Sequence, residues 1–429
     1  MSLLSSLTSG TAGLASASSD LSVISDNIAN SNTVGYKAQR AAFEDALAQN
    51  VVGGTGQVGA GSRLQAVEKI MTQGALQSTG VATDMALQGD GFFVVTGTSL
   101  AGRTGTFLTR AGQFTVDRTG YLVNLDGLRL QGFAADATGK TTSTVGDILV
   151  GNATSQPRAT SELTFRANLQ ADAPIPAAAW DPAQAAATSS FSTAFTLYDA
   201  LGKETAAQLY FRRTGTGTWD YHAVVDGGAV QGGAVGTPTE IASGALTFDG
   251  QGLLQDVQPA TGSFSPATGG TQTLAFDFGD PTSSGGSGLA GLTQFASPSA
   301  TTFVGQDGYA AGQLSSLQID RTGTVLGVFT NGQTRAIAQV GIARVASPGQ
   351  LERTGGNLYA TTLDSGAAVL GAAGEGGRAF VTAGSLEQSN VDIAEQFVRM
   401  IAAQRAFEAN SKTITTADQL LSELIAMKR

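Results

Sequence analysis

The chain has 429 residues, which at about 150 residues per domain predicts two or three domains with more than one hydrophobic core. Glycine supplies 57 residues and charged residues only 14% of the chain, so the sequence is rich in turns and weakly charged. The 34 acidic and 24 basic residues give a net charge of −10, which argues against a nucleic-acid partner. With no cysteine and a single histidine, His222, the chain has no thiol nucleophile, disulfide or Cys/His metal site.

The N-terminal segment predicts a helix with a pairing seam. From Leu3 to Ile28, apolar and small side chains alternate at steps of four and three, which is heptad spacing. One stripe consists of Leu7, Leu14, Leu21 and Ile28, and the other of Gly10, Ala17 and Ile24. The flanking positions are mostly Ser and Thr, so we expect this segment to be disordered when alone. Its end is marked by the turn-forming residues Asn30, Ser31, Asn32 and Gly35.

Several motifs that could suggest ligand binding or targeting have simpler explanations. Residues 54–59 match G-x-G-x-x-G but lack a βαβ unit and a following ribose-binding acid, so we interpret them as a flexible loop. Residues 89–92 are expected to form a hairpin turn, and His222 to lie on a strand face. The first basic residue is Lys37 and apolar runs such as 92–95 are short, so neither a cleaved signal nor membrane insertion is expected. No catalytic residue, cofactor or metal is expected.

The middle of the chain predicts β structure. Short strand-like runs are separated by Asp-Gly and Asn-Gly signals, which are typical of hairpins. These signals are Asp90-Gly91, Asp126-Gly127, Asp226-Gly227, Asp249-Gly250, Asp307-Gly308 and Asn331-Gly332. The tetrapeptide Asp-Arg-Thr-Gly occurs at 117–120 and again at 320–323, between similar strand-like runs.

The two tetrapeptide copies indicate one β domain built from both halves of the chain, with another domain inserted between them. Independent use of common turn chemistry is the alternative. We expect a helical domain at 1–70 plus 390–429, with a connecting segment, and a discontinuous inner β domain at 71–157 plus 297–389. An outer β domain is expected at 158–296. The fold class is therefore mainly β, with α-helical termini paired as a coiled coil.

The C-terminal segment is the strongest helix prediction. The residues that recur every seven positions are Ile393, Met400, Phe407, Ile414 and Leu421, with Phe397 and Ile425 on a companion stripe that also holds Gln404, Ser411 and Asp418. Ser389 or Asn390 is expected to cap the helix, and Lys428 and Arg429 to close its negative end. Two interpretations remain open: ordinary amphipathic helices that pack on the body, or terminal helices that pair with each other and then between subunits.

Both ends of the chain resemble one known family. Residues 27–37, Asn-Ile-Ala-Asn-Ser-Asn-Thr-Val-Gly-Tyr-Lys, are similar to the amino-terminal signature of bacterial flagellar rod and hook proteins. Residues 389–393 and 400–418 are similar to its carboxyl-terminal signature, except that Phe407 stands where the typical motif has Tyr. The motif positions singled out are Asn27, Asn30, Asn32, Gly35, Tyr36, Gln404, Arg405 and Asn410. The length of the chain and its large insertion favour the hook members of the family.

The resemblance implies a structural subunit, not an enzyme, that self-assembles into the hook, the curved flexible joint between the basal-body rod and the filament. It also implies export through the flagellar type III apparatus to an extracellular location, and contacts with distal rod, hook cap and hook-filament junction proteins. The alternatives are the distal rod or another axial protein and, less favoured, a secreted β-rich adhesin. The expected assembly interface consists of Leu7, Leu14, Leu21, Ile24, Ile28, Ile393, Phe397, Met400, Phe407, Ile414 and Leu421.

Overall fold

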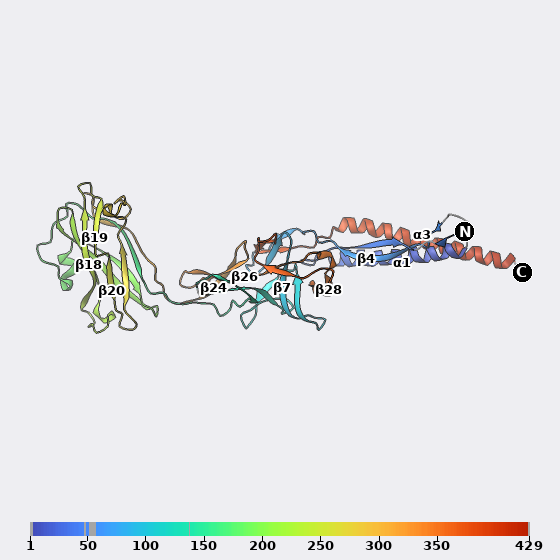
Figure 1. The fold of residues 1–429 in the computed structure, drawn as a ribbon, viewed down its shortest axis with the longest axis horizontal. Helices are drawn as coiled ribbons and strands as arrows, with labels where there is room; N and C mark the ends of the chain where they lie inside the picture. The colour runs from blue at the N-terminus through green and yellow to red at the C-terminus, as the bar shows by residue number, and fades with distance from the viewer. Residues whose placement is uncertain (1–2, 47–48, 51–56, 137, 428–429) are drawn as a thin grey trace. The chain divides into compact units, whose positions relative to one another are not determined.

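The computed structural model describes residues 3–46, 49–50, 57–136 and 138–427 (Figure 1). The G-x-G-x-x-G motif lies partly, and Lys428 and Arg429 lie wholly, outside the described residues. The chain forms two compact units. Unit 1 consists of Met1–Ala153, Leu314–Val328 and Thr334–Arg429, and unit 2 of Thr154–Gln313 and Phe329–Gln333. The three-domain division expected from the sequence stays a prediction.

Unit 1 begins and ends with long helices, as the heptad patterns predict. Helix α1 spans Leu3–Ala29 and helix α3 spans Ile393–Met427, and the two lie side by side with the chain termini at the same end of the pair (Figure 1). A two-stranded ribbon, β1 (Gln39–Asp45) with β4 (Ser62–Lys69), packs along α1. The termini therefore pair within one chain, which is the first half of the sharper sequence interpretation.

The start of α3 differs from the expected cap. The side chain of Asp392, not that of Ser389 or Asn390, accepts the helix N–H groups, with Oδ1 lying 2.8 Å from Ala394 N and 3.1 Å from Glu395 N. An aspartate in this position satisfies free backbone donors and also places a negative charge at the positive end of the helix dipole. Asn390 is instead used in a tertiary contact described below.

The largest sheet of unit 1 joins segments from both halves of the chain. Its central order is β24 (Gly312–Ile319), β25 (Thr324–Phe329), β26 (Thr334–Val340), β11 (Arg129–Ala135), β7 (Phe92–Thr98), β8 (Thr104–Thr109), β29 (Leu358–Ala360) and β28 (Glu352–Gly355). Further strands on it are β9 (Phe114–Val116), β10 (Leu122–Asn124), β12 (Thr141–Asp147), β27 (Ile342–Arg344) and β30 (Val369–Gly371). The two halves of the chain are linked by the pairing of β11 with β26, of β7 with β27 and of β8 with β29.

The two Asp-Arg-Thr-Gly copies form the same turn at two places in this sheet. Asp117 Oδ1 accepts from the N–H groups of Thr119 and Tyr121, at 2.9 and 2.8 Å. Asp320 Oδ1 accepts in the same way from Thr322 and Thr324, at 2.8 Å each. The repeat therefore has a structural basis: the aspartate side chain holds the backbone of a short loop between neighbouring strands.

Not every Asp-Gly signal closes a tight hairpin. Residues 89–91 link β6 (Met85–Gln88) to β7, but β6 pairs with β31 (Phe380–Ala383) and β7 pairs with β8, so the hairpin expected there is wrong. The neighbouring strand pair is β5 (Leu76–Ser78) with β32 (Ser385–Glu387). Strand pairing across the chain overrides local turn chemistry at this position.

Unit 2 is a two-sheet β structure around an aromatic core. One sheet has the order β15 (Phe191–Tyr198), β16 (Glu204–Gly215), β17 (Thr218–Asp226), β18 (Pro238–Phe248) and β19 (Leu254–Gln258). The other contains β20 (Thr261–Phe264), β21 (Gln272–Asp277), β14 (Glu162–Asn168), β22 (Leu292–Thr293) and β23 (Ala300–Gln306). Buried residues of both sheets form one cluster that includes Phe165, Phe211, Trp219, Tyr221 and Phe278. Such face-to-face packing needs one apolar face per sheet, which the alternating burial along β16 provides.

The close packing around Gly112 in unit 1 predicts that a larger residue there destabilises the protein. A Cβ atom at Gly112 would lie 1.5 Å from the carbonyl oxygen of Met85, whereas one at Gly105 would meet no atom within 4 Å. We expect Gly112→Ala to lower the free energy of unfolding by about 2 kcal/mol or more, because the backbone must move to admit the methyl group. Gly105→Ala is the control. Equal denaturation midpoints for the two variants would contradict this account.

Candidate assembly site at the terminal helices

The two terminal helices pack closely and run antiparallel. Asn27, near the end of α1, donates a hydrogen bond of 3.1 Å to Gln396, near the start of α3. Gly13, in the first half of α1, faces Asn410 so closely that a Cβ atom at Gly13 would lie 2.6 Å from Asn410 Nδ2. Small residues on α1 therefore allow the backbones to approach, and the seam is partly polar.

The seam contains most, but not all, of the predicted stripes. On α1, Gly10, Ala17, Ile24 and Asn27 are buried, and Leu7, Leu14, Leu21 and Ile28 are half-buried. On α3, Gln396, Ala403 and Ala417 are buried, and Met400, Asn410, Ile414 and Leu421 are half-buried. The predicted companion stripe is wrong for this intrachain pairing, because Phe397, Gln404, Asp418 and Ile425 are exposed and Ser411 is half-buried. Ile393 and Phe407 are also exposed.

One ionisable group lies beside the seam. Asp20 is half-buried on α1, and burial raises the pKa of its carboxyl group, while the positive charge of Arg399 on α3 opposes that rise. A raised pKa means that the folded state favours the protonated acid. Ionisation of Asp20 at neutral pH therefore destabilises the helix pair.

The helix pair is fastened to the β sheet by a buried carboxylate, that of Glu387. Its Oε1 lies 2.6 Å from Lys37 Nζ, and its Oε2 lies 3.2 Å from the guanidinium of Arg110. The backbone N–H of Gly74 also donates to Oε1, at 2.9 Å. The side chains of Lys37 and Glu387 are 1% and 0% exposed, and burial lowers the pKa of the Lys37 amine while the charge of Glu387 opposes that change. A fully enclosed charge network of this kind tolerates little displacement of its members.

The motif residues around Lys37 extend this network. The Tyr36 hydroxyl donates to Asp26 at 3.0 Å and to Asn27 at 3.2 Å, and burial raises the pKa of Tyr36 to about 12. Asp26 in turn forms an ion pair of 3.1 Å with Arg353, whose guanidinium also lies 5.1 Å from the centre of the Tyr36 ring. Asn27 Oδ1 accepts from Gln39 N at 2.8 Å. The end of α1 is thereby held by the turn that follows it and by the β sheet.

Gly35 and Asn390 complete the junction. Gly35 has φ +70°, and a Cβ atom there would lie 2.5 Å from Ala111 N, so both the backbone conformation and the space require glycine. The Gly35 N–H donates to the carbonyl oxygen of Glu387 at 2.7 Å. Asn390 Oδ1 accepts from Ala38 N at 2.7 Å, and its Nδ2 donates to the carbonyl oxygen of Ile70 at 2.8 Å. Residues of the two terminal motifs thus meet at one junction.

The remaining motif residues lie outside the junction. Asn30 is half-buried and bonds to Asp26, at 2.9 Å from its carbonyl oxygen and 3.0 Å from its Oδ1. Asn32, Gln404 and Arg405 are exposed, and Arg405 forms an ion pair of 3.2 Å with Glu408 on the same helix. Sequence reasoning missed Glu387, which belongs to no quoted motif and contacts Lys37 across 350 residues of chain. Arg110 lies in the segment 109–132, which resembles hook proteins, but its role as a partner of Glu387 was not predicted.

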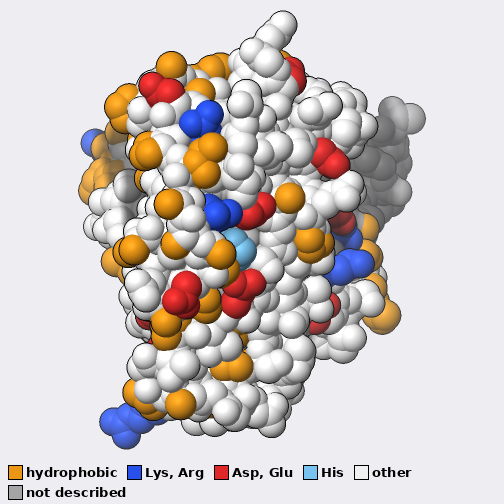
Figure 2. Space-filling view, turned by 90° about the vertical axis from the view of Figure 1, so that its left-hand side faces the viewer, with side chains coloured by type: hydrophobic (Ala, Val, Ile, Leu, Met, Phe, Trp, Pro, Cys, Tyr) orange, Lys and Arg blue, Asp and Glu red, His pale blue; other side chains and the backbone are white. Residues whose placement is uncertain are grey.

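Unit 2 contains the only histidine of the chain, in a structural role. His222 lies on β17 as expected, its ring stacked on Trp180 at 4.1 Å, and its Nδ1 lies 3.2 Å from Glu240 Oε2. The Trp180 indole donates to the same oxygen at 2.7 Å, and burial lowers the pKa of the histidine. Figure 2 shows the histidine with acidic side chains beside it on this face. The cluster holds the loop that contains Trp180 against the sheet.

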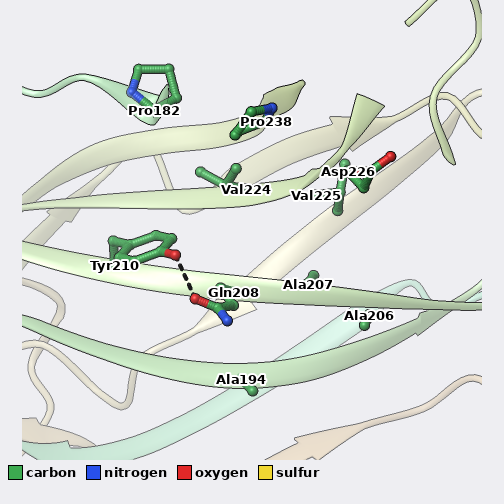
Figure 3. A pocket seen from close by; sticks show the side chains of 10 residues that line it. All are labelled: Pro182, Ala194, Ala206, Ala207, Gln208, Tyr210, Val224, Val225, Asp226 and Pro238. Atoms are coloured by element: carbon green, nitrogen blue, oxygen red, sulfur yellow. Dashed lines mark hydrogen bonds between the residues drawn. The ribbon is translucent and has the colours of Figure 1, made fainter. Parts of the chain in front are cut away.

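A shallow cavity of about 300 Å3 lies on the same sheet (Figure 3). The side chains of Ala194, Ala206 and Val224 lie along it, and the Tyr210 hydroxyl is hydrogen-bonded to Gln208. Asp226 is bound to the N–H groups of Gly228 and Gly236, at 2.7 and 2.9 Å. No nucleophile paired with a general base lines this cavity, so its described residues offer no catalytic arrangement.

No group of three or more His, Asp or Glu side chains in the described ranges is arranged to hold a metal ion. Neither terminal helix, over its described length, combines the length and apolar character needed to cross a bilayer. The terminal helices and their junction are thus the candidate site.

Family comparisons cover most of the chain. A model of the flagellar hook protein FlgE/F/G D1 domain matches residues 86–168, and a model of the flagellar basal body protein FlaE D2 domain matches residues 168–309. A flagella basal body rod protein model matches residues 7–37, and a model of the flagellar basal body rod FlgEFG protein C-terminal region matches residues 382–427.

Full-length relatives agree with these models. The flagellar hook protein FlgE of Treponema pallidum is 34% identical, with 100% of both chains covered. That of Salmonella typhimurium is 32% identical, covering 99% of this chain and 100% of the other. The crystal structure of Helicobacter pylori flagellar hook protein FlgE2 matches 73% of this chain and 99% of its own at 16% identity, with a TM-score of 0.47, a likeness too low to bear on the assignment.

Terminal helices joined at a buried junction, a β body between them and matches to flagellar domain models along the chain define an axial protein of the bacterial flagellum. Since full-length relatives at 34% identity are hook proteins, the chain belongs to the flagellar hook protein family. This family consists of structural proteins and not of enzymes.

The buried carboxylate makes a stability prediction. We expect Lys37→Met to lower the free energy of unfolding by about 3 kcal/mol or more, because one partner of a buried ion pair is removed. Arg40→Met is the matched control, since Arg40 forms an exposed pair with Glu68 that contributes less than about 1 kcal/mol. Chemical denaturation of the two variants measures the difference, and similar losses would contradict the assigned role of Glu387.

Asp20 makes a pH prediction. Because its pKa is raised above 3.8 in the folded state, the stability associated with the protonated acid is fully present below pH 3.8 and is lost as the pH rises through the folded-state pKa. We expect Asp20→Asn to raise the melting temperature at pH 7, and this gain to vanish at acidic pH. Asp418→Asn, at an exposed position on α3, is the control. A gain that is independent of pH would contradict this explanation.

Proposed function

We propose that this chain is the repeating subunit of the flagellar hook and that its terminal helices carry the contacts between copies. The observation that supports this most directly is the apolar surface of α3. Ile393, Phe397, Ile401, Phe407 and Ile425 are all at least 40% exposed in the single chain, although they lie on a long regular helix. Apolar side chains in such a row are the usual mark of a surface that is covered in an assembly.

Assembly through these helices has a physical driving force. Covering exposed apolar surface contributes about 25 cal/mol per Å2. Polar seam residues such as Gln396 and Asn410 make the pairing of α1 and α3 weaker than that of a leucine-rich coiled coil. Free subunits would therefore stay dissociated until a growing end supplies further helices.

The hook must transmit torque while it bends, and the two units have different roles in this. The junction at Glu387 gives each subunit a fixed connection between its helices and the sheet of unit 1. Unit 2, with its polar loops, supplies outer contacts that can slide at little cost in energy. The corresponding domains are 1–70 plus 390–429, 71–157 plus 297–389, and the insertion at 158–296.

The location and partners follow from this assignment. The chain passes through the flagellar type III export apparatus and assembles outside the cell. Its neighbours are other copies of itself, the distal rod protein at one end of the hook, and the hook cap and junction proteins at the other. Exposed Asn32, Gln404 and Arg405 are the motif residues available for contacts between copies.

Single substitutions on the helices test this assignment. We expect Leu14→Asp or Phe407→Asp to abolish polymerisation of the purified chain onto hook fragments. Phe407 is exposed and Leu14 is half-buried in the single chain, so each substitution places a charge on surface that the polymer covers. Phe407→Leu keeps an apolar side chain and should still assemble. Sedimentation measures the polymer, and circular dichroism checks the β units. Loss of the β signal in Phe407→Asp would contradict the prediction.

The cellular role is tested by electron microscopy of basal bodies from a strain that lacks this chain. Rods and rings without a hook or filament are the expected result. A missing distal rod would move the assignment to the rod, and intact hooks would overturn it.

A further inference from the structure

The N-terminal third of α3 carries an apolar patch that the single chain leaves uncovered. Ile393, Phe397 and Ile401 follow one another at intervals of four residues, which places them along one face of the helix, and they are between 43% and 58% exposed. Near the patch, Glu395 and Arg399 neutralise each other in an ion pair of 2.7 Å. The patch therefore presents large apolar side chains without an unpaired charge from this ion pair.

Helix α1 carries a surface that can receive such side chains. Leu7, Leu14 and Leu21 recur every seven residues and are only half-buried by α3, so part of each side chain remains open. Beside this row the exposed positions hold small uncharged residues such as Ala15 and Ser18. No charged residue precedes Asp20 in the sequence. Covering this row would therefore desolvate no charge over most of the length of α1.

The patch and the row cannot meet within one chain. The residues of α3 that face α1 of the same chain are Gln396, Ala403 and Ala417, which are buried, whereas the patch residues are exposed. On another copy, the leucine row of α1 offers an uncharged and partly open apolar surface for the patch. Because the patch and the row are different surfaces, a copy bound through one of them still offers the other, so the contact can be repeated from copy to copy.

We propose that the patch Ile393, Phe397 and Ile401 of one copy packs on the leucine row Leu7, Leu14 and Leu21 of the next copy. This inference rests on the proposed function, because it specifies which helix faces join neighbouring hook subunits. It continues the intrachain seam, where large side chains of α3 such as Ile414 already pack on the small residue Gly10 of α1. Each α1 is thereby covered by two α3 helices, its own and that of a neighbour.

The absence of cysteine makes a direct test possible. Full-length Phe397→Cys is mixed with full-length Leu7→Cys, Leu14→Cys or Leu21→Cys, the mixture is polymerised, and mild oxidation is followed by denaturing electrophoresis. We expect disulfide-linked dimers of the two different chains with at least one position of the row. The matched control is Ala406→Cys, an exposed position on α3 outside the patch, which should give no such dimer.

The outcomes separate this inference from the proposed function. Unmodified chains that do not polymerise onto added hook fragments would overturn both. Polymers in which Phe397→Cys links to no position of the row, links only to itself, or links no better than Ala406→Cys would overturn the proposed pairing and leave the hook assignment intact. As a second measure, Phe397→Asp and Ile401→Asp should each lower the polymer yield at least tenfold, while Phe397→Leu should not.

Discussion

The buried carboxylate of Glu387 is the interaction on which the rest of unit 1 depends. It is bound by the amine of Lys37, the guanidinium of Arg110 and the N–H of Gly74, and the backbone carbonyl of the same residue accepts from Gly35. Gly35 and Lys37 follow α1, Gly74 lies between β4 and β5, and Arg110 directly follows β8. Glu387 itself ends β32, the last strand before α3. An enclosed charge with several donors permits few arrangements, so the path of the chain at the base of both helices is fixed.

Because the Glu387 junction fixes one end of the helix pair, the contacts between α1 and α3 need not be strong. Contacts such as Gly13 against Asn410 and Asn27 against Gln396 supply little apolar burial, and much of α3 stays exposed. A helix pair held at one end needs less stabilisation along its length, because part of the entropy of pairing has already been lost at the junction. The surface left free on α3 is then available to other copies.

Much of this arrangement follows from the sequence, and what was missed has identifiable causes. Heptad spacing predicted both terminal helices and the row Leu7, Leu14 and Leu21. The two copies of Asp-Arg-Thr-Gly predicted a β sheet with strands from both halves of the chain. Heptad spacing does not determine which of two apolar stripes faces the partner helix. In the structure the small residue Ala403 is buried against α1, whereas the large residue Phe397 is exposed. The role of Glu387 depends on a residue 350 positions away, and no local pattern carries that information.

The contact between Lys37 and Glu387 also closes a very long loop, which contains all of unit 2. The entropic cost of closing a loop grows only with the logarithm of its length, so doubling such a loop costs only about 0.6 kcal/mol. Hence the part of this loop that forms unit 2 can be lengthened or shortened with little effect on how the ends join, because the groups that bind Glu387 lie outside unit 2. A change in the size of unit 2 therefore leaves the geometry at the base of the two helices unchanged.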